Sequence, residues 1–196
     1  KNVAVEGGKS IDFKNKEKIE SIDIEGSTRV VSVTSLVNEC INLKKLRLVD
    51  HSGLIQIPEN LILSKLINLS HLELINVKVQ GGFFVNKGIM NNLKTIILEN
   101  TNYSIISVDN MKLDYFHCIN NRNISQIDFT SCSIHELKIN SNFQPGITLN
   151  SPNLIVNNFL FKGLKLQISN PIIVNTYLDI NATTIEGTIK VKELQT

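Results

Sequence analysis

The segment INLKKLRLVD (residues 41–50) carries leucines in the spacing apolar-x-x-apolar-x-apolar, with lysine or arginine in every gap. In the second half of this spacing apolar and charged residues alternate, which is typical of a β-strand with one face toward a core and the other toward water. A cation in each gap is expected if the gaps face solvent. The segment therefore predicts a short strand with its leucines inside.

The same spacing recurs along the chain, and the first copies follow one another at steps of about 24 to 26 residues. The copies are IESIDI (19–24), LKKLRL (43–48), LSHLEL (69–74), LKTIIL (93–98), LDYFHC (113–118), ISQIDF (124–129) and IHELKI (134–139). Stacked in parallel, about 4.8 Å apart, such copies build a continuous apolar column that no single copy could supply. The repeat therefore predicts a solenoid.

These copies resemble the leucine-rich repeat family over roughly residues 19–140, and the fullest is ISQIDFTSCSI (124–134), where Cys132 and Ile134 complete L-x-x-L-x-L-x-x-C-x-L. The family places Asn or Cys three residues after the last strand leucine. The residues at that position here are Ser27, His51, Val77, Thr101, Asn121, Cys132 and Asn142. The resemblance thus implies an irregular, diverged member, with its polar ladder interrupted at His51 and Val77.

After residue 118 the apolar pairs are only about 10 or 11 residues apart, which is too short for a leucine-rich coil of at least about 20 residues. Taken alternately, the pairs form two series with steps of about 20 residues, and only the last step of the second series, to Ile189/Val191, is slightly longer. The first series is Phe116/Cys118, Leu137/Ile139, Phe159/Phe161 and Leu178/Ile180, and the second is Ile127/Phe129, Ile147/Leu149, Leu166/Ile168 and Ile189/Val191. Two series predict two walls, so the later coils should return by a second strand.

The connections between strands are predicted from short motifs. TSLVNEC (34–40) and ENLILSKL (59–66) are candidate return helices of the early coils, and NSPNL (150–154), SNPII (169–173) and NATTI (181–185) are candidate corners. Asn is very abundant, and it tolerates the left-handed conformation and can bond backbone groups of a neighbouring coil. We also expect one of the adjacent phenylalanines in GGFFVNKGIM (81–90) to be exposed.

Together these features predict one right-handed parallel solenoid, α/β to mainly β, in which leucine-rich repeats grade into a two-walled β-solenoid. Residues 1–18 are expected to be an N-terminal cap or linker, 19–140 the irregular repeats, and 141–196 the β-solenoid-like coils and a cap, continuous with 19–140. Terminal coils should be capped, because an open end exposes the apolar column and unpaired strand edges.

Composition narrows the classes of function. Apolar residues make up 42% of the chain and charged residues 19%, with a formal charge of +2, which fits a soluble protein without strong attraction to nucleic acid. No apolar run reaches the roughly 18 residues that a membrane span needs, so we expect no membrane insertion. Cys40, Cys118 and Cys132 form no C-x-x-C pair, which argues for thiols in a core and against a disulfide framework or a zinc site.

Stacking the copies predicts two solvent-facing rows on the sheet. The first row is Ser21, Lys45, His71, Thr95 and Tyr115, and the second is Asp23, Arg47, Glu73, Ile97 and His117. The candidate partner-binding residues on the concave face are Lys45, Arg47, His71, Glu73, Tyr115 and His117. Two interpretations stay open: a charge ladder in which Arg47 lies between Asp23 and Glu73 and supports strand register, or a recognition surface centred on the aromatic and imidazole side chains.

No catalytic or metal-binding residue is predicted, and no cofactor. His71 and His117 should stand two rungs apart, about 9 to 10 Å, which is too far for one zinc ion. The alternation places Cys118 inward and His117 outward, so the thiol should be buried and protonated. Asp128 should lie on a different wall from Glu136 and Lys138, which argues against an acid–base pair.

The resemblance implies a non-enzymatic module that binds a protein partner on its concave β-sheet, of the kind found in secreted effectors and surface proteins of bacteria, and we expect a monomer. An intracellular, translocated or secreted bacterial location is favoured over a disulfide-rich extracellular one. Alternative hypotheses are a structural, self-assembling solenoid, and the targeting domain of a larger enzyme, which a chain beginning at Lys1 allows.

Overall fold

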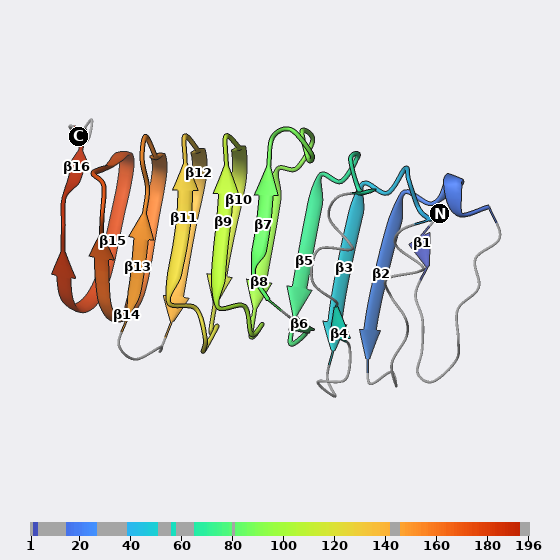
Figure 1. The fold of residues 1–196 in the computed structure, drawn as a ribbon, viewed down its shortest axis with the longest axis horizontal. Helices are drawn as coiled ribbons and strands as arrows, with labels where there is room; N and C mark the ends of the chain where they lie inside the picture. Colours follow the sequence, from blue (N-terminus) through green and yellow to red (C-terminus); the bar gives the residue numbers. More distant parts are fainter. Residues whose placement is uncertain are drawn as a thin grey trace.

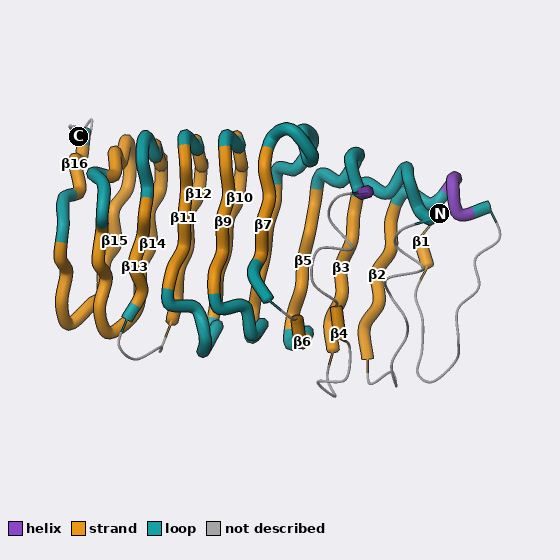
Figure 2. Tube along the Cα trace, in the orientation of Figure 1, coloured by secondary structure: helices purple, strands orange, loops and turns teal. Residues whose placement is uncertain are grey.

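The chain winds into a parallel β-solenoid whose two ends lie at opposite ends of its long axis (Figure 1). The computed structural model describes residues 2–3, 15–26, 39–50, 56–57, 65–79, 81–141 and 146–192. Within these ranges helical residues are confined to 3-10 turns, at η1 (Lys16–Lys18) and at Lys65 (Figure 2). The central residues of the two predicted return helices, 34–40 and 59–66, lie outside the described ranges.

A first wall runs the length of the solenoid, and its neighbouring strands are all parallel. Its strands are β2 (Ser21–Gly26), β3 (Lys45–Asp50), β5 (His71–Ile75), β8 (Thr95–Glu99), β10 (Lys112–Ile119), β12 (Ser133–Ser141), and the first parts of β14 (Ile155–Ile168) and β15 (Ile172–Glu186). At the N-terminal end β1 (Asn2–Val3) pairs with β2, and at the C-terminal end β16 (Ile189–Val191) pairs with the first residues of β15.

A second wall faces the first and runs in the opposite direction (Figure 1). Its strands are β7 (Phe83–Asn86), β9 (Ile105–Asp109), β11 (Gln126–Thr130), β13 (Ile147–Asn150) and the last parts of β14 and β15. The short strands β4 (Gln56–Ile57) and β6 (Lys78–Val79) pair separately with each other. The second wall therefore begins at β7, earlier than the change of spacing after residue 118 predicted.

The core is the apolar column between the walls. Inward side chains of the first wall stack in one line, each at most 1% exposed: Ile22, Leu46, Leu72, Ile96, Phe116, Leu137 and Phe159. Phe116 also packs edge-on against Phe129 of the second wall, with ring centroids 5.0 Å apart. The first predicted series is confirmed, because Phe116, Leu137, Phe159 and Leu178 are successive register partners.

The register predicted for the second series is wrong in two places. Ile127 pairs with Leu149, not with Ile147, because this coil is two residues longer than the expected step of 20. A slip of two residues preserves the alternation of faces, so the same side chains stay buried. Leu166 pairs with Ile185, while Ile189 pairs with Ile172, because β15 continues through 181–185, where the sequence predicted a corner.

Asparagines form the corners, as their abundance predicted. Asn76, Asn100 and Asn120 follow first-wall strands in the left-handed conformation, and each donates its backbone N–H to the next coil, at 2.7 to 3.0 Å. The opposite corner has the same conformation at Asn110, Ser131 and Asn153. A third line of Asn side chains, at positions 42, 68 and 92, donates to the backbone carbonyls of Glu17, Ile41 and Ile67 in the preceding coils. Asn thus satisfies backbone groups that a sharp turn would otherwise leave without partners.

One polar ladder is fully buried. The Asn121 carboxamide oxygen accepts from the backbone N–H and the hydroxyl of Thr101, both at 2.6 Å, and its amide group donates to the Leu98 carbonyl at 2.8 Å. One coil before Thr101 the equivalent position is the buried, apolar Val77, where the sequence predicted an interruption. His51, the other predicted interruption, lies outside the described residues.

Candidate functional site

The two predicted surface rows are present in the first wall. Residue by residue, the register joins Ser21, Lys45, His71, Thr95 and Tyr115, and in parallel Asp23, Arg47, Glu73, Ile97 and His117. The rows continue onto β12 as Glu136 and Lys138. All of these side chains point away from the core because they alternate with the buried column. This outer surface of the first wall is called the first-wall face below.

Arg47 is the centre of a carboxylate cluster on three adjacent strands. Its Nη1 donates to Glu25 Oε2 at 2.8 Å and to Asp23 Oδ1 at 2.9 Å, and its Nε lies 3.4 Å from Glu73 Oε1. Hydrogen bonds to Glu25 and Asp23 raise the pKa of the guanidinium above its already high ordinary value. Glu73 also approaches His71 Nε2, at 3.4 Å. The charge of Arg47 is therefore balanced by carboxylates of the same protein, whereas Lys45 on the same strand is exposed.

Tyr115 is the centre of a second, aromatic cluster. Its ring meets the imidazoles of His117 and His135 edge-on, at centroid distances of 5.9 and 6.5 Å. His117 Nε2 is 2.7 Å from Glu136 Oε1, a contact that holds the imidazole in place. Tyr115 is nevertheless 42% exposed. The cluster thus presents a large amphipathic side chain whose neighbours are already fixed, which lowers the entropy lost when a partner binds.

The structure divides the six predicted residues between these two clusters. Lys45, Arg47, His71 and Glu73 lie on β3 and β5, whereas Tyr115 and His117 lie on β10, and the β8 rung with Thr95 and Ile97 separates the two groups. Sequence reasoning missed two members of the aromatic cluster, His135 and Glu136. The sequence did contain a signal for Glu136. Because Phe116 and Leu137 belong to one predicted series, the residues before them, Tyr115 and Glu136, should also be neighbours.

His135 belongs to a line of side chains at the bend of successive coils. Asn175 Nδ2 donates to Asn157 Oδ1 at 3.0 Å, and Asn157 Nδ2 lies 3.1 Å from His135 Nδ1. Since Asn157 uses its oxygen as the acceptor for Asn175, its amide group faces His135, whose Nδ1 must accept. The line ends at the buried Asn175 Oδ1, which has no donor among the described residues.

The thiols are buried, as predicted for Cys118 and Cys132, and none of the three cysteines forms a disulfide bond. Burial raises the pKa of the Cys118 thiol to about 12 and that of Cys132 to about 11, and burial also raises the pKa of Cys40. Cys118 and His117 point to opposite sides of β10.

The charged residues considered as an acid–base set lie on different walls. Asp128 lies on β11 of the second wall and Glu136 and Lys138 on β12 of the first, so the structure does not bring them together.

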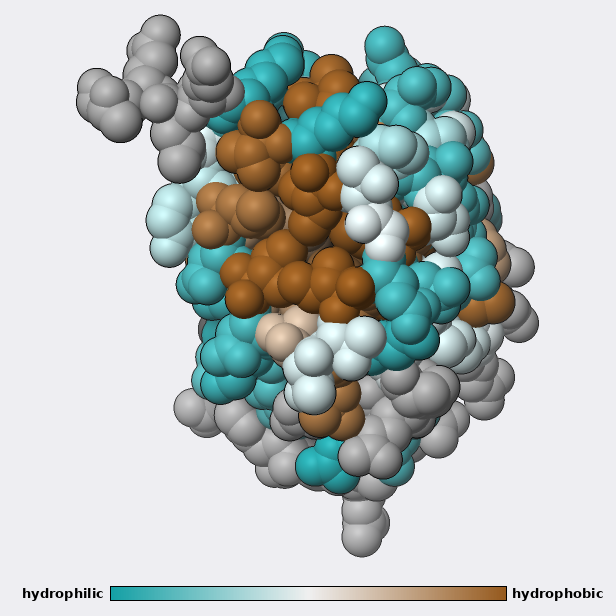
Figure 3. All heavy atoms as spheres, turned by 90° about the vertical axis from the view of Figure 1, so that its left-hand side faces the viewer, coloured by the Kyte–Doolittle hydropathy of each residue, from teal (hydrophilic) through white to brown (hydrophobic). Residues whose placement is uncertain are grey.

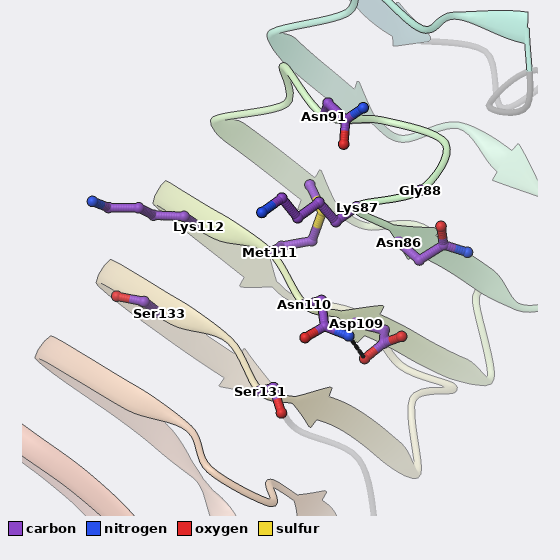
Figure 4. Close-up of a pocket in the computed structure, with 10 residues that line it drawn as sticks. All are labelled: Asn86, Lys87, Gly88, Asn91, Asp109, Asn110, Met111, Lys112, Ser131 and Ser133. Atoms are coloured by element: carbon purple, nitrogen blue, oxygen red, sulfur yellow. Dashed lines mark hydrogen bonds between the residues drawn. The ribbon is translucent and has the colours of Figure 1, made fainter.

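A polar groove of about 610 Å³ lies along the corner where the second-wall strands end and the chain turns toward the next first-wall strands (Figure 4). Its lining includes Lys87, Asp109, Asn110 and Ser131, and Asn110 Nδ2 donates to Asp109 Oδ1 at 3.1 Å. Asn110 and Ser131 are also two of the left-handed corner residues. The groove is therefore formed by the outer surface of the corners that follow the second-wall strands.

The two adjacent phenylalanines of β7 differ in exposure. Phe83 is buried and Phe84 is 51% exposed, which confirms the prediction for this pair.

Within the described ranges, no three His, Cys, Asp or Glu side chains are grouped so that they could hold a metal ion. No helix in the same ranges has the length and apolar character to span a membrane. Comparisons with models of protein families, with curated proteins and with solved structures found no match to this chain.

Proposed function

We propose that this chain is a non-enzymatic recognition module that binds a protein partner on the first-wall face. The observation that carries the proposal is the aromatic cluster: a half-exposed Tyr115 whose neighbours His117, His135 and Glu136 are held by contacts across two strands. Tyrosine is enriched at the energetic centres of protein interfaces, and fixed neighbours reduce the entropic cost of binding.

The two clusters have different parts in this proposal. Arg47 forms ion pairs with Asp23, Glu25 and Glu73, so it mainly aligns the strands and offers little free charge to a partner. Lys45 and His71 flank it, and the β8 rung connects it to the Tyr115 cluster. The partner therefore contacts Tyr115 and His117 at the centre, with Lys45, Arg47, His71 and Glu73 at the polar rim.

The test is site-specific photo-cross-linking. A photo-reactive amino acid replaces Thr95, between the two clusters, and in a matched variant it replaces Thr148, a half-buried threonine in β13 of the second wall. We expect a protein from cell lysate to be cross-linked from position 95 and not from position 148. Equal cross-linking from both positions would contradict the proposal.

Alanine variants then identify the centre of the site. Tyr115→Ala should reduce capture of the same protein about tenfold, because truncating a hot-spot side chain typically costs more than 1 kcal/mol. Tyr177→Ala is the matched control, since Tyr177 stands in the same row and is also exposed. Capture that survives Tyr115→Ala would move the site away from this cluster.

We also propose that the coils up to about residue 140 are irregular leucine-rich repeats, and that the chain acts as a secreted effector or surface protein of a bacterium. The support is the L-x-x-L-x-L spacing, whose leucines lie in the buried column, together with the longer steps of the early coils. NMR chemical shifts of residues 34–40 and 59–66 test the family assignment. Helical shifts would support leucine-rich coils, and extended shifts would contradict them.

A further inference from the structure

The polar groove beside the second wall is formed by a change in the length of successive corners. The connection from β7 to β8 spans residues 87–94, whereas those from β9 to β10 and from β11 to β12 are only residues 110–111 and 131–132. The longer connection projects beyond the shorter ones (Figure 1), and the space beside it is the groove of about 610 Å³. The residues drawn in Figure 4 all lie within the continuously described stretch 81–141.

The longer connection is held in one conformation by its own hydrogen bonds. The Asn86 carboxamide oxygen accepts from the backbone N–H of Ile89 at 3.1 Å, and the Asn86 carbonyl accepts from the N–H of Met90 at 3.0 Å. Met90 is fully buried, and the Lys87 N–H donates to the Asp109 carbonyl in the next coil at 3.2 Å. This wall of the groove is therefore preorganised, which lowers the entropy lost when a ligand binds.

Positive charge collects on one side of the groove. The side chains of Lys87 and Lys112 extend to the same side of the corner, while Asp109 lies on the other side (Figure 4). Lys94 is close to them, because its Nζ donates to the Lys112 carbonyl at 3.3 Å. None of these lysines forms an ion pair with a carboxylate of the described residues, whereas Asp109 accepts from Asn110 Nδ2 at 3.1 Å. The lysine side therefore attracts an anionic group.

The rest of the lining offers neutral hydrogen-bonding groups. The carboxamides of Asn91 and Asn110 are exposed, and so are the hydroxyl-bearing side chains of Ser131 and Ser133. Met111, the one large apolar side chain among the described lining residues, is buried. Ligand pockets are usually lined mainly by apolar and aromatic side chains, so this composition favours a ligand covered with hydroxyl groups.

Two other classes of ligand fit the groove less well. Nucleobases bind by stacking on aromatic side chains, and none of the described lining residues is aromatic. A protein segment usually binds through an apolar anchor. Hydrophobic side chains gather at the C-terminal end of the solenoid (Figure 3), but the described lining of the groove exposes none. The attraction for a ligand must therefore come from charge and hydrogen bonds.

We propose that this groove binds an acidic saccharide. The acidic group of the sugar, a sulfate, phosphate or carboxylate, lies between Lys87 and Lys112. Its hydroxyl groups form hydrogen bonds with Asn91, Asn110 and Ser133. Neighbouring coils are about 4.8 Å apart, so the three coils that line the groove extend over about 10 Å, roughly the length of a disaccharide. This site is separate from the first-wall face and does not depend on the proposed protein partner.

The test follows amide chemical shifts of the ¹⁵N-labelled protein. The probes are a sulfated disaccharide prepared from heparin, digalacturonate and glucose 6-phosphate, which carry sulfate with carboxylate, carboxylate alone and phosphate. Lactose and inorganic sulfate are the controls. We expect at least one acidic saccharide to shift the signals of Gly88, Asn110 and Ser131 saturably, with a Kd at least about tenfold lower than that of lactose or inorganic sulfate. The saccharide that binds most tightly identifies the acidic group.

Charge variants show whether the lysines of the groove hold the ligand. A double variant with Lys87→Gln and Lys112→Gln should weaken saccharide binding about tenfold, and binding to the unchanged protein should fall with added salt. The matched control combines Lys162→Gln and Lys190→Gln, which removes two exposed lysines of β14 and β16 and should leave binding unchanged. Urea denaturation checks that both double variants are folded.

A second pair of substitutions tests the contacts to the sugar hydroxyls. Asn91→Ala together with Ser133→Ala should weaken saccharide binding about fivefold and leave the weaker binding of inorganic sulfate unchanged. The proposal is wrong if none of the three acidic saccharides binds, if lactose or inorganic sulfate binds as tightly, or if the two lysine double variants behave alike. It is also wrong if the Asn91 and Ser133 substitutions change saccharide and sulfate binding to the same extent, because the groove would then hold an adventitious ion only.

Discussion

The middle of the solenoid and its C-terminal end contain the same kinds of residue in different states of burial. Leu137 and Leu178 occupy the same row of the core, yet Leu137 is fully buried while Leu178 remains partly exposed. Asn121 in the middle has partners for both ends of its carboxamide, whereas the carboxamide oxygen of Asn175 near the end has no donor among the described residues. These differences in burial and hydrogen bonding come from the coils that pack against each residue, because the residue types are the same. In this fold the burial of a side chain therefore depends on the two coils next to its own, as expected for stacked repeats.

The largest contrast should appear in thiol reactivity. Cys118 and Cys132 lie in the buried middle, so a maleimide reagent should modify them only when the structure opens. Ala182→Cys places a thiol in the last coil, at a partly exposed position. We expect the new thiol to react at least about a thousandfold faster, measured by mass spectrometry under native conditions. Comparable rates would show that the middle opens as readily as the end.

The same thiols make a prediction about pH. Folding raises the pKa of Cys118 from an ordinary 9.0 to about 12 and that of Cys132 to about 11. The unfolded chain then loses these protons at lower pH than the folded chain. The stabilising contribution is therefore complete below pH 9 and is lost as the pH rises toward 11 to 12. A Cys118→Ala variant should lose less stability than the unchanged protein between pH 9 and pH 10.5, as measured by urea denaturation.

Truncation of the two matched leucines comes next in size. Leu137→Ala creates a cavity between two neighbouring coils and should lower the free energy of unfolding by about 3 kcal/mol. Leu178→Ala removes a side chain that is covered on one side only, so its cost should be about 1 kcal/mol. Urea denaturation with a common m value measures both. Equal costs would mean that the end coil is as well covered as the middle.

Asparagine substitutions test the polar side of the comparison. Asn121→Ala leaves the Thr101 N–H and the Leu98 carbonyl buried without partners. It should lower the free energy of unfolding by slightly less than Leu137→Ala does, that is by just under about 3 kcal/mol. Asn175→Ala removes one hydrogen bond together with an unsatisfied oxygen, and should change stability by about 0.5 kcal/mol or less. A large loss for Asn175→Ala would show that its oxygen has a donor in solution.

The sequence was sufficient to predict what depends on alternation. The parity of each strand decides which residues reach the core, so the rows through Lys45 and Arg47 and the column through Phe116 could be predicted from spacing alone. Left-handed corners could also be anticipated, because Asn is one of the few residues that adopt them readily.

Features set by loop length or by bends could not be predicted in this way. The step from Ile127 to Leu149 is two residues longer than its neighbours suggested, and apolar spacing contains no information on loop length. β7 was missed because Phe83 and Phe84 are both apolar and hide the alternation of a strand. His135 and Asn175 lie at bends, where polar contacts between coils follow no hydrophobic period. The aromatic cluster was therefore only partly predicted.

The smallest expected effect concerns charge. Arg47 in the interior of the row has carboxylates on both adjacent strands, Asp23 and Glu73, whereas Asp179 at the end has no cation among the described side chains. Arg47→Gln should therefore cost about 1 kcal/mol, because three carboxylates remain close together without their cation, and the cost should change with added salt, since these groups are partly exposed. Asp179→Asn should leave stability unchanged at any salt concentration. If both variants behave alike in urea at low and high salt, Arg47 does not stabilise the register, and its side chain would instead be available for a partner on the first-wall face.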